Sequence, residues 1–150
     1  MSNFDNITDP EVIGPGYWAQ IHFEALRATN DDRRSKFIEK MKLLPTEFPC
    51  GDCRPHIDKF IKENPLEKFK DLKYKGKDIG LFYWSWLFHN EVNSRLGKYQ
   101  PSIEEAYSYY SQEIQQVCTG CGNKGKNKII SNTSSRDRSV SNGFRIVSRT

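Results

Sequence analysis

The segment of residues 78–97, DIGLFYWSWLFHNEVNSRLG, limits the folds open to this chain. Its apolar residues recur at helical spacing, and Gly97 is a residue type that commonly ends a helix. At 100° per residue, one face about 120° wide gathers aromatic rings, an imidazole, amides, a leucine and a glycine. These residues are Phe82, Trp86, His89, Asn90, Asn93, Leu96 and Gly97.

An ordinary core face would be aliphatic, and a buried amide without a partner costs about 1–3 kcal/mol. This mixed face therefore predicts a bound molecule that is flat and rich in hydrogen-bonding atoms. The alternative is a core histidine bonded to neighbouring amides, with the asparagines exposed. Trp18 and His22, four residues apart, repeat the theme on another helical segment, although that spacing alone also fits ordinary packing.

Four other segments also have helical periodicity. They cover residues 16–29, 31–44, 50–64 and 102–117. Ser102 and Glu105 form the S-x-x-E pattern of a capping box. We find no alternating strand and no repeat, so we predict an all-α fold in one domain: a four-helix bundle with a short fifth helix.

The two ends of the chain differ from its body. The first residues show neither a basic start nor an apolar run, and no stretch of about 18 apolar residues occurs, so we expect no secretory signal and no membrane insertion. The overall charge is +4, but residues 122–150 hold seven Lys or Arg and one Asp, which leaves the rest at −2. This Ser-, Asn- and Gly-rich tail is predicted to be mostly disordered. The roles that its composition predicts are solubility or targeting, or weak electrostatic attachment to nucleic acid or an anionic surface.

All four cysteines fall in two C-x-x-C pairs, Cys50/Cys53 and Cys118/Cys121. A shared zinc site is disfavoured, because 64 residues separate the pairs where zinc ribbons use about 15–20. A thioredoxin-like site would need a βαβ unit, and the sequence predicts none. The redox interpretation has a mechanism: a helix start stabilises a thiolate, which can pass electrons to a flat acceptor. A small zinc-stabilised helical adaptor with a basic, partner-binding tail remains the alternative.

Three motifs, GPGYWAQIH, FPCGDC and HNEVNSRLGK, occur in this order along the chain. Together they resemble the Erv/ALR family of FAD-linked sulfhydryl oxidases, and most closely its short members encoded by large DNA viruses. The resemblance covers roughly residues 14–117. It divides the chain into a flexible N-terminus (1–13), the oxidase domain (14–117) and a basic tail with its own C-x-x-C pair (118–150).

The resemblance implies an enzyme that oxidises protein dithiols through Cys50 and Cys53, FAD and finally oxygen, giving hydrogen peroxide. Cys53 would lie next to the flavin and Cys50 would exchange with substrate, while Cys118 and Cys121 are a possible shuttle. The implied FAD-binding residues are Gly14, Trp18, His22, Cys53, His89, Val92, Asn93, Leu96, Lys98 and Tyr107. The resemblance further implies a homodimer. Since the sequence shows no secretory signal, we expect the protein in the cytoplasm or the virion, and we expect no metal site.

Overall fold

The computed structural model describes residues 8–115, with side chains through residue 112. Its elements are α1 (Pro10–Arg27), α2 (Asp31–Glu47), α3 (Arg54–Glu63), the 3-10 helix η1 (Leu66–Lys68), α4 (Gly80–Arg95) and α5 (Ile103–Gln115). Within this part of the chain no strand forms, and the one isolated bridge joins Tyr74 to Lys77. The predicted all-α class with five α-helices is confirmed.

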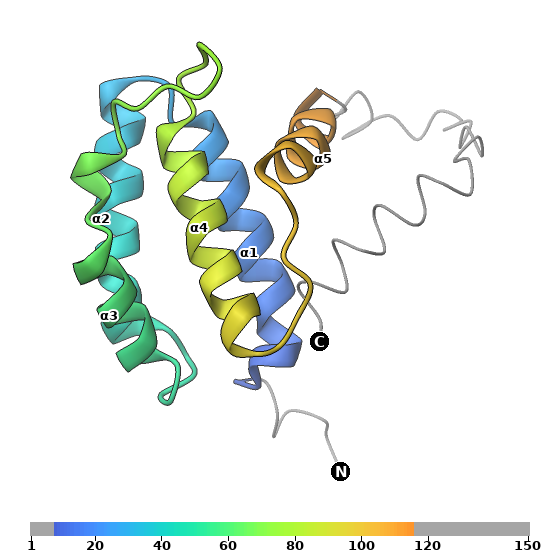
Figure 1. Cartoon of the computed structure of the whole chain (residues 1–150). Coiled ribbons are helices and arrows are strands. Elements are labelled where there is room, and N and C mark those ends of the chain that lie inside the picture. Colours follow the sequence, from blue (N-terminus) through green and yellow to red (C-terminus); the bar gives the residue numbers. More distant parts are fainter. Residues whose placement is uncertain (1–7, 116–150) are drawn as a thin grey trace, which may run out of the picture.

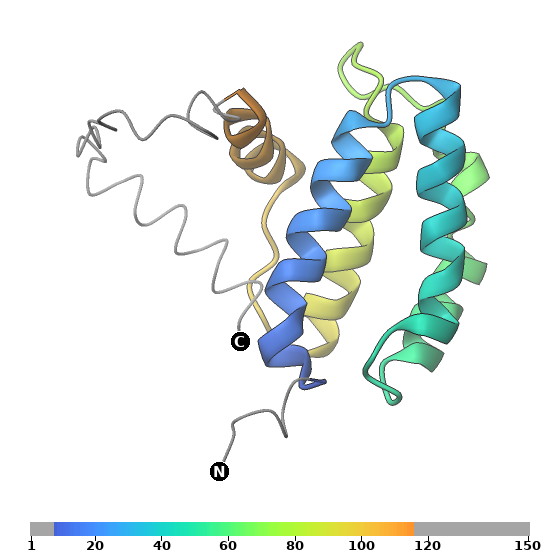
Figure 2. The ribbon, with the colours of Figure 1, turned by 180° about the vertical axis from the view of Figure 1, so that it is seen from behind.

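Helices α1 to α4 form two layers. Helices α1 and α4 run side by side in the middle, and α2 and α3 lie together on one side of them (Figure 1). Helix α5 packs on the other side, against α1 and α4, and the view from behind shows the same order (Figure 2). The arrangement leaves α1, α3 and α4 facing one another at the end where α3 begins.

Three boundaries differ by three or more residues from the sequence-based expectation, and one of them is the start of α3, at Arg54 where Cys50 was expected. Helix α1 begins at Pro10, inside the N-terminal segment 1–13 that was predicted to be flexible, because Asp9 caps it by accepting from the Glu11 amide at 2.9 Å. Helix α2 continues through Pro45 to Glu47, where a stop before the proline was predicted. Pro45 cannot donate to the carbonyl four residues earlier, but the last turn still closes through the Phe48 amide and the Leu44 carbonyl at 2.9 Å.

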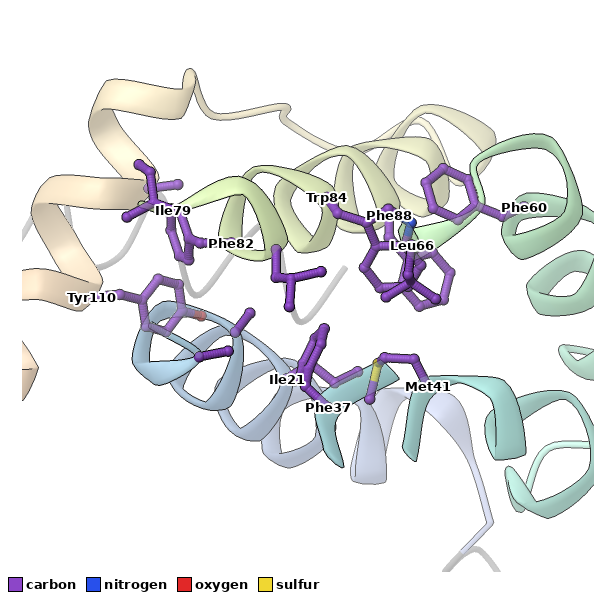
Figure 3. Close-up of a cluster of buried hydrophobic side chains, with 14 of the residues drawn as sticks. Ile21, Phe37, Met41, Phe60, Leu66, Ile79, Phe82, Trp84, Phe88 and Tyr110 are labelled. Carbon is purple, nitrogen blue, oxygen red and sulfur yellow. The ribbon is translucent and has the colours of Figure 1, made fainter. Parts of the chain in front are cut away.

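The core lies between the two layers and is centred on α4 (Figure 3). Trp84, Phe82, Met41 and Leu66 are fully buried, and the Trp84 indole donates to the Asn64 carbonyl at 2.8 Å. The start of α4 is pressed against the segment after η1, since a Cβ at Gly80 would stand 1.9 Å from the Phe69 carbonyl oxygen. This close contact holds the start of α4 in place, and α4 carries several of the candidate site residues.

Candidate active site

A disulfide joins Cys50 and Cys53 at the start of α3, where the sequence placed the pair. Cys53 is the N-cap residue, and its carbonyl accepts from the amides of His56 and Ile57 at 3.1 Å each. The free amides of a helix N-terminus stabilise negative charge nearby. When the disulfide is reduced, this position favours the thiolate form of Cys53.

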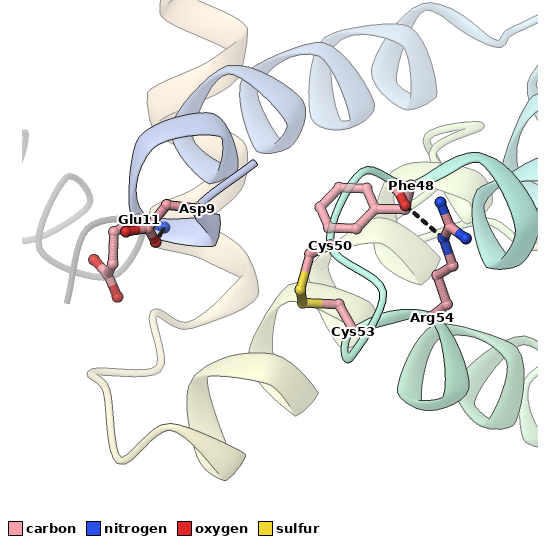
Figure 4. Close-up of a disulfide and its surroundings, with 6 residues drawn as sticks. All are labelled: Asp9, Glu11, Phe48, Cys50, Cys53 and Arg54. Atoms are coloured by element: carbon pink, nitrogen blue, oxygen red, sulfur yellow. Dashed lines mark hydrogen bonds between the residues drawn. A yellow bond between two sulfur atoms is a disulfide. The ribbon is translucent and has the colours of Figure 1, made fainter. Parts of the chain in front are cut away.

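Two contacts hold the loop of residues 48–53, which carries the disulfide, in position. Arg54 reaches back and its Nε donates to the Phe48 carbonyl at 2.6 Å (Figure 4). The Phe48 ring packs edge-on against Tyr17 of α1, with ring centroids 4.8 Å apart. These two contacts do not involve the sulfur atoms, so we expect the loop to keep its place when the disulfide opens.

The disulfide lines a cavity of about 650 Å³ between α1, α3 and α4. Pockets for small molecules and cofactors typically measure about 300–1,000 Å³. Eight of the residues singled out from the sequence border it: Gly14, Trp18, Cys50, Cys53, Val92, Asn93, Leu96 and Lys98. The rest of the wall is mostly apolar and includes residues that the sequence reasoning did not propose, among them Leu44, Phe48, Phe60 and Phe88.

Polar groups gather where α4 ends. Asn93 is 1% exposed, and its carbonyl accepts from the Lys98 amide at 2.8 Å. Gly97 has a φ of 67°, a left-handed conformation that lets the chain reverse so that Lys98 returns to the cavity. The Lys98 side chain is only 9% exposed and its ammonium lies 3.3 Å from Glu11. The cavity therefore combines apolar walls with the Asn93 amide and the charged groups of Glu11, Arg95 and Lys98 at this end.

His22 and His89 stand behind the cavity wall and do not border the cavity itself. The His89 ring stacks on Trp18, with centroids 3.9 Å apart and planes within 8°. His22 Nε2 lies 2.9 Å from His89 Nδ1, and both imidazoles are buried. The two buried histidines therefore support the Trp18 side chain, which forms part of the cavity wall (the Trp18 wall).

The single face predicted for the long helix is divided in the structure. The Trp86 indole and the Asn90 amide both donate to the Pro101 carbonyl, at 2.8 and 3.0 Å, and so bind the α4–α5 connection. Tyr107 also lies away from the cavity, where its hydroxyl accepts from Lys77 at 3.0 Å. Of the predicted FAD-binding set, His22, His89 and Tyr107 do not border the cavity, and of these the two histidines pack behind its Trp18 wall.

Burial lowers the pKa of His22 from 6.5 to about 3, because the imidazolium would lose its hydration. The unfolded chain binds a proton at His22 below pH 6.5 and the folded chain does not. We therefore expect the free energy of unfolding to fall as the pH drops below 6.5, by up to about 1.4 kcal/mol per pH unit. Urea unfolding between pH 7 and pH 5 measures this slope.

His22→Gln should flatten that dependence, since glutamine does not titrate. His56→Gln is the matched control, because His56 is exposed and its replacement leaves the buried imidazole in place. Equal slopes for the wild type and His22→Gln would contradict the assignment.

The geometry agrees with what comparison with known proteins finds. The chain belongs to the Erv1/Alr family, whose family model matches residues 15–115. The chain is 30% identical over 104 residues to a protein of African swine fever virus named FAD-linked sulfhydryl oxidase, which covers 67% of this chain and 82% of the relative. It is also 28% identical over 109 residues to Sulfhydryl oxidase 1 of Arabidopsis thaliana, covering 71% of this chain and 19% of that longer protein. No solved structure shows a significant match.

The zinc alternative finds no support. The sulfur atoms of Cys50 and Cys53 are bonded to each other, and residues 8–115 bring no three His, Cys, Asp or Glu side chains together as a metal site. Cys118 and Cys121 lie outside the described residues. In the same part of the chain, no helix has both the length and the apolar character needed to cross a membrane.

Proposed function

We propose that this protein is an FAD-dependent thiol oxidase that forms disulfide bonds in substrate proteins. The observation that carries the proposal is the Cys50–Cys53 disulfide in the wall of a largely apolar cavity of about 650 Å³. The names of the viral and plant relatives support the same activity. Protein dithiols are the electron donors and oxygen is the final acceptor.

The donor set of the cavity fits FAD. Trp18 and Phe88 offer ring surfaces for a flat ligand, Asn93 offers a buried amide for hydrogen bonds, and Lys98 offers positive charge for phosphate. Gly14 lies on the same wall without a side chain that would narrow the cavity. When bound, FAD supplies the two-electron transfer to oxygen that yields hydrogen peroxide.

The two cysteines take different roles in this proposal. Cys53 packs against the hydrophobic core at the helix start, which suits the sulfur that faces the cofactor. Cys50 precedes the exposed residues Gly51 and Asp52, which suits exchange with a substrate thiolate. Substrate thiolate attacks the Cys50 sulfur, a mixed disulfide forms and Cys53 leaves as a thiolate; the second substrate thiolate then releases Cys50. The substrate gains one disulfide, and Cys50 and Cys53 hold the two electrons.

The direct test measures cofactor and oxygen together. Purified full-length protein should show the absorption spectrum of oxidised flavin and consume oxygen when dithiothreitol is added. Hydrogen peroxide should accumulate in equal amount to the oxygen consumed. A colourless protein that neither binds added FAD nor consumes oxygen would contradict the proposal.

Cys118 and Cys121 are proposed to shuttle electrons from protein substrates to Cys50–Cys53. The pair sits within Cys118-Thr-Gly-Cys121-Gly, where two glycines allow many backbone conformations. A short flexible tether raises the effective concentration of a linked group to about millimolar. Changing both residues to serine should slow oxidation of a folded protein dithiol severalfold and leave dithiothreitol oxidation unchanged. Equal loss with both substrates, or no loss with either, would exclude the shuttle role.

The remaining assignments concern assembly and place. We propose a homodimer in the host cytoplasm or the virion, with at most weak nucleic-acid binding through the basic tail. The relatives in African swine fever virus support a viral setting. Sedimentation of the holoprotein at low and high salt, with and without nucleic acid, tests the homodimer and the nucleic-acid binding.

A further inference from the structure

Three hydrogen bonds in series lead from α4 to α1 and from α1 back to α4. They lie behind Trp18, whose side chain forms part of the cavity wall. The Ser85 hydroxyl donates to the Phe82 carbonyl at 2.7 Å, and His22 Nδ1 lies 2.9 Å from the same hydroxyl oxygen. His22 Nε2 then lies 2.9 Å from His89 Nδ1. Ser85, His22 and His89 are 0%, 1% and 2% exposed. The proposed mechanism assigns Ser85 no role.

The number of protons available determines which group donates and which accepts in each of the three hydrogen bonds. A carbonyl only accepts and a serine hydroxyl has one proton, so a Ser85 that donates to Phe82 must accept from His22 Nδ1–H. Neutral His22 then has its lone pair on Nε2, which accepts from His89 Nδ1–H. This direction satisfies all three bonds.

The opposite direction satisfies fewer groups. If the Ser85 proton pointed to His22 Nδ1, the contact between the Ser85 oxygen and the Phe82 carbonyl would lose its hydrogen bond. Buried polar groups are nearly always hydrogen-bonded, because an unmade bond there is costly. Burial also holds the pKa of His22 low, so the ring stays neutral and keeps one donor and one acceptor.

We propose that Ser85 is a positioning residue that sets both imidazoles as Nδ1–H tautomers and, through His89, holds Trp18 in place in the cavity wall. Ser85 does not border the cavity, so it acts through the two rings. His89 transmits the effect because its ring lies parallel to Trp18 at 3.9 Å. Only the nature of the cavity's ligand in this inference rests on the proposed function.

The tautomers can be observed directly. The sequence contains three histidines, His22, His56 and His89, so a long-range ¹H–¹⁵N correlation spectrum of the labelled holoprotein contains three imidazoles. The spectrum of His56→Gln identifies the exposed ring. We expect both buried rings to carry the proton on Nδ1. An Nε2–H signal from either buried ring of the wild type would overturn the proposal.

A second experiment tests the role of Ser85. Ser85→Ala removes the acceptor of His22 Nδ1–H, so we expect Nε2–H signals to appear and flavin to dissociate about tenfold faster, the effect of about one buried hydrogen bond. Ser85→Thr, which keeps the hydroxyl, should restore the wild-type tautomers. Ser111→Ala is the matched control, because the Ser111 hydroxyl also donates to the carbonyl three residues earlier, at 3.3 Å, but touches no histidine.

The outcomes separate this inference from the proposed function. Unchanged tautomers together with an unchanged flavin dissociation rate in Ser85→Ala would overturn the positioning role. A protein that binds no flavin would contradict the proposed function. The tautomers of His22 and His89 in the wild type would still decide which groups donate in the three hydrogen bonds. If Ser85→Ala fails to fold, the wild-type and Ser85→Thr spectra decide the assignment.

Discussion

Replacing Cys53 with serine is expected to lower thiol oxidation by on the order of a thousandfold or more while flavin stays bound, since the nucleophile is removed and the cavity is not. Cys53 caps α3 with its backbone carbonyl, which serine retains. Arg54 still holds the Phe48 carbonyl, so the loop keeps its position. Oxygen uptake with dithiothreitol, measured beside the flavin absorbance of the same sample, checks both halves of the prediction.

The partner variant distinguishes the two sulfurs. Cys50→Ser should stop turnover equally, but it leaves the Cys53 thiol beside the flavin, where its thiolate gives a long-wavelength absorption band. Cys53→Ser should lack that band. The double variant Cys118→Ser/Cys121→Ser is the control, because it removes two cysteines and should oxidise dithiothreitol normally. A band in Cys53→Ser and none in Cys50→Ser would reverse the two roles.

Two features that the sequence predicted correctly, the capping box and the position of the C-x-x-C pair, depend on local sequence pattern. The capping box is present, with the Glu105 amide donating to the Ser102 hydroxyl at 3.1 Å and the Ser102 amide donating back to Glu105 at 2.8 Å. The C-x-x-C pair lies at the start of α3, as its position before a helical stretch indicated. Such features need only a few neighbouring residues, and these interactions form whatever the rest of the fold does.

The partners of Trp86, Asn90 and Tyr107 depend on tertiary packing, which the sequence pattern does not reveal. Trp86 and Asn90 share a helical face with His89, yet the connection to α5 places the Pro101 carbonyl against them. Tyr107 is held by Lys77, a residue 30 positions away on a turn whose approach no periodicity indicates.

Ser85 had a usable signal. It precedes His89 by one helical turn, and that spacing puts both side chains on one face. The signal is weak because serine is also common on exposed helix surfaces, and tertiary packing is what brings His22 of α1 within 2.9 Å of the Ser85 hydroxyl.

Asn93→Ala is expected to weaken flavin binding at least about tenfold, since Asn93 is the buried amide that borders the cavity. Ligand binding to the native state adds to its stability, so a tenfold loss of affinity lowers the free energy of unfolding of the holoprotein by about 1.4 kcal/mol. Loss of the Asn93 side chain itself lowers stability further. Flavin titration and thermal unfolding of the same preparations measure the two effects.

Trp86→Phe is the matched control, because the Trp86 indole on the same helix donates to the Pro101 carbonyl at 2.8 Å outside the cavity and makes no hydrogen bond to Asn93. It should lower stability by about 1 kcal/mol through the lost hydrogen bond and leave flavin affinity unchanged. The contrast is informative because a general loosening of α4 would weaken flavin binding in both variants. Equal flavin affinity in Asn93→Ala and the wild type would remove Asn93 from the binding site and would leave Lys98 and the aromatic walls to hold the cofactor.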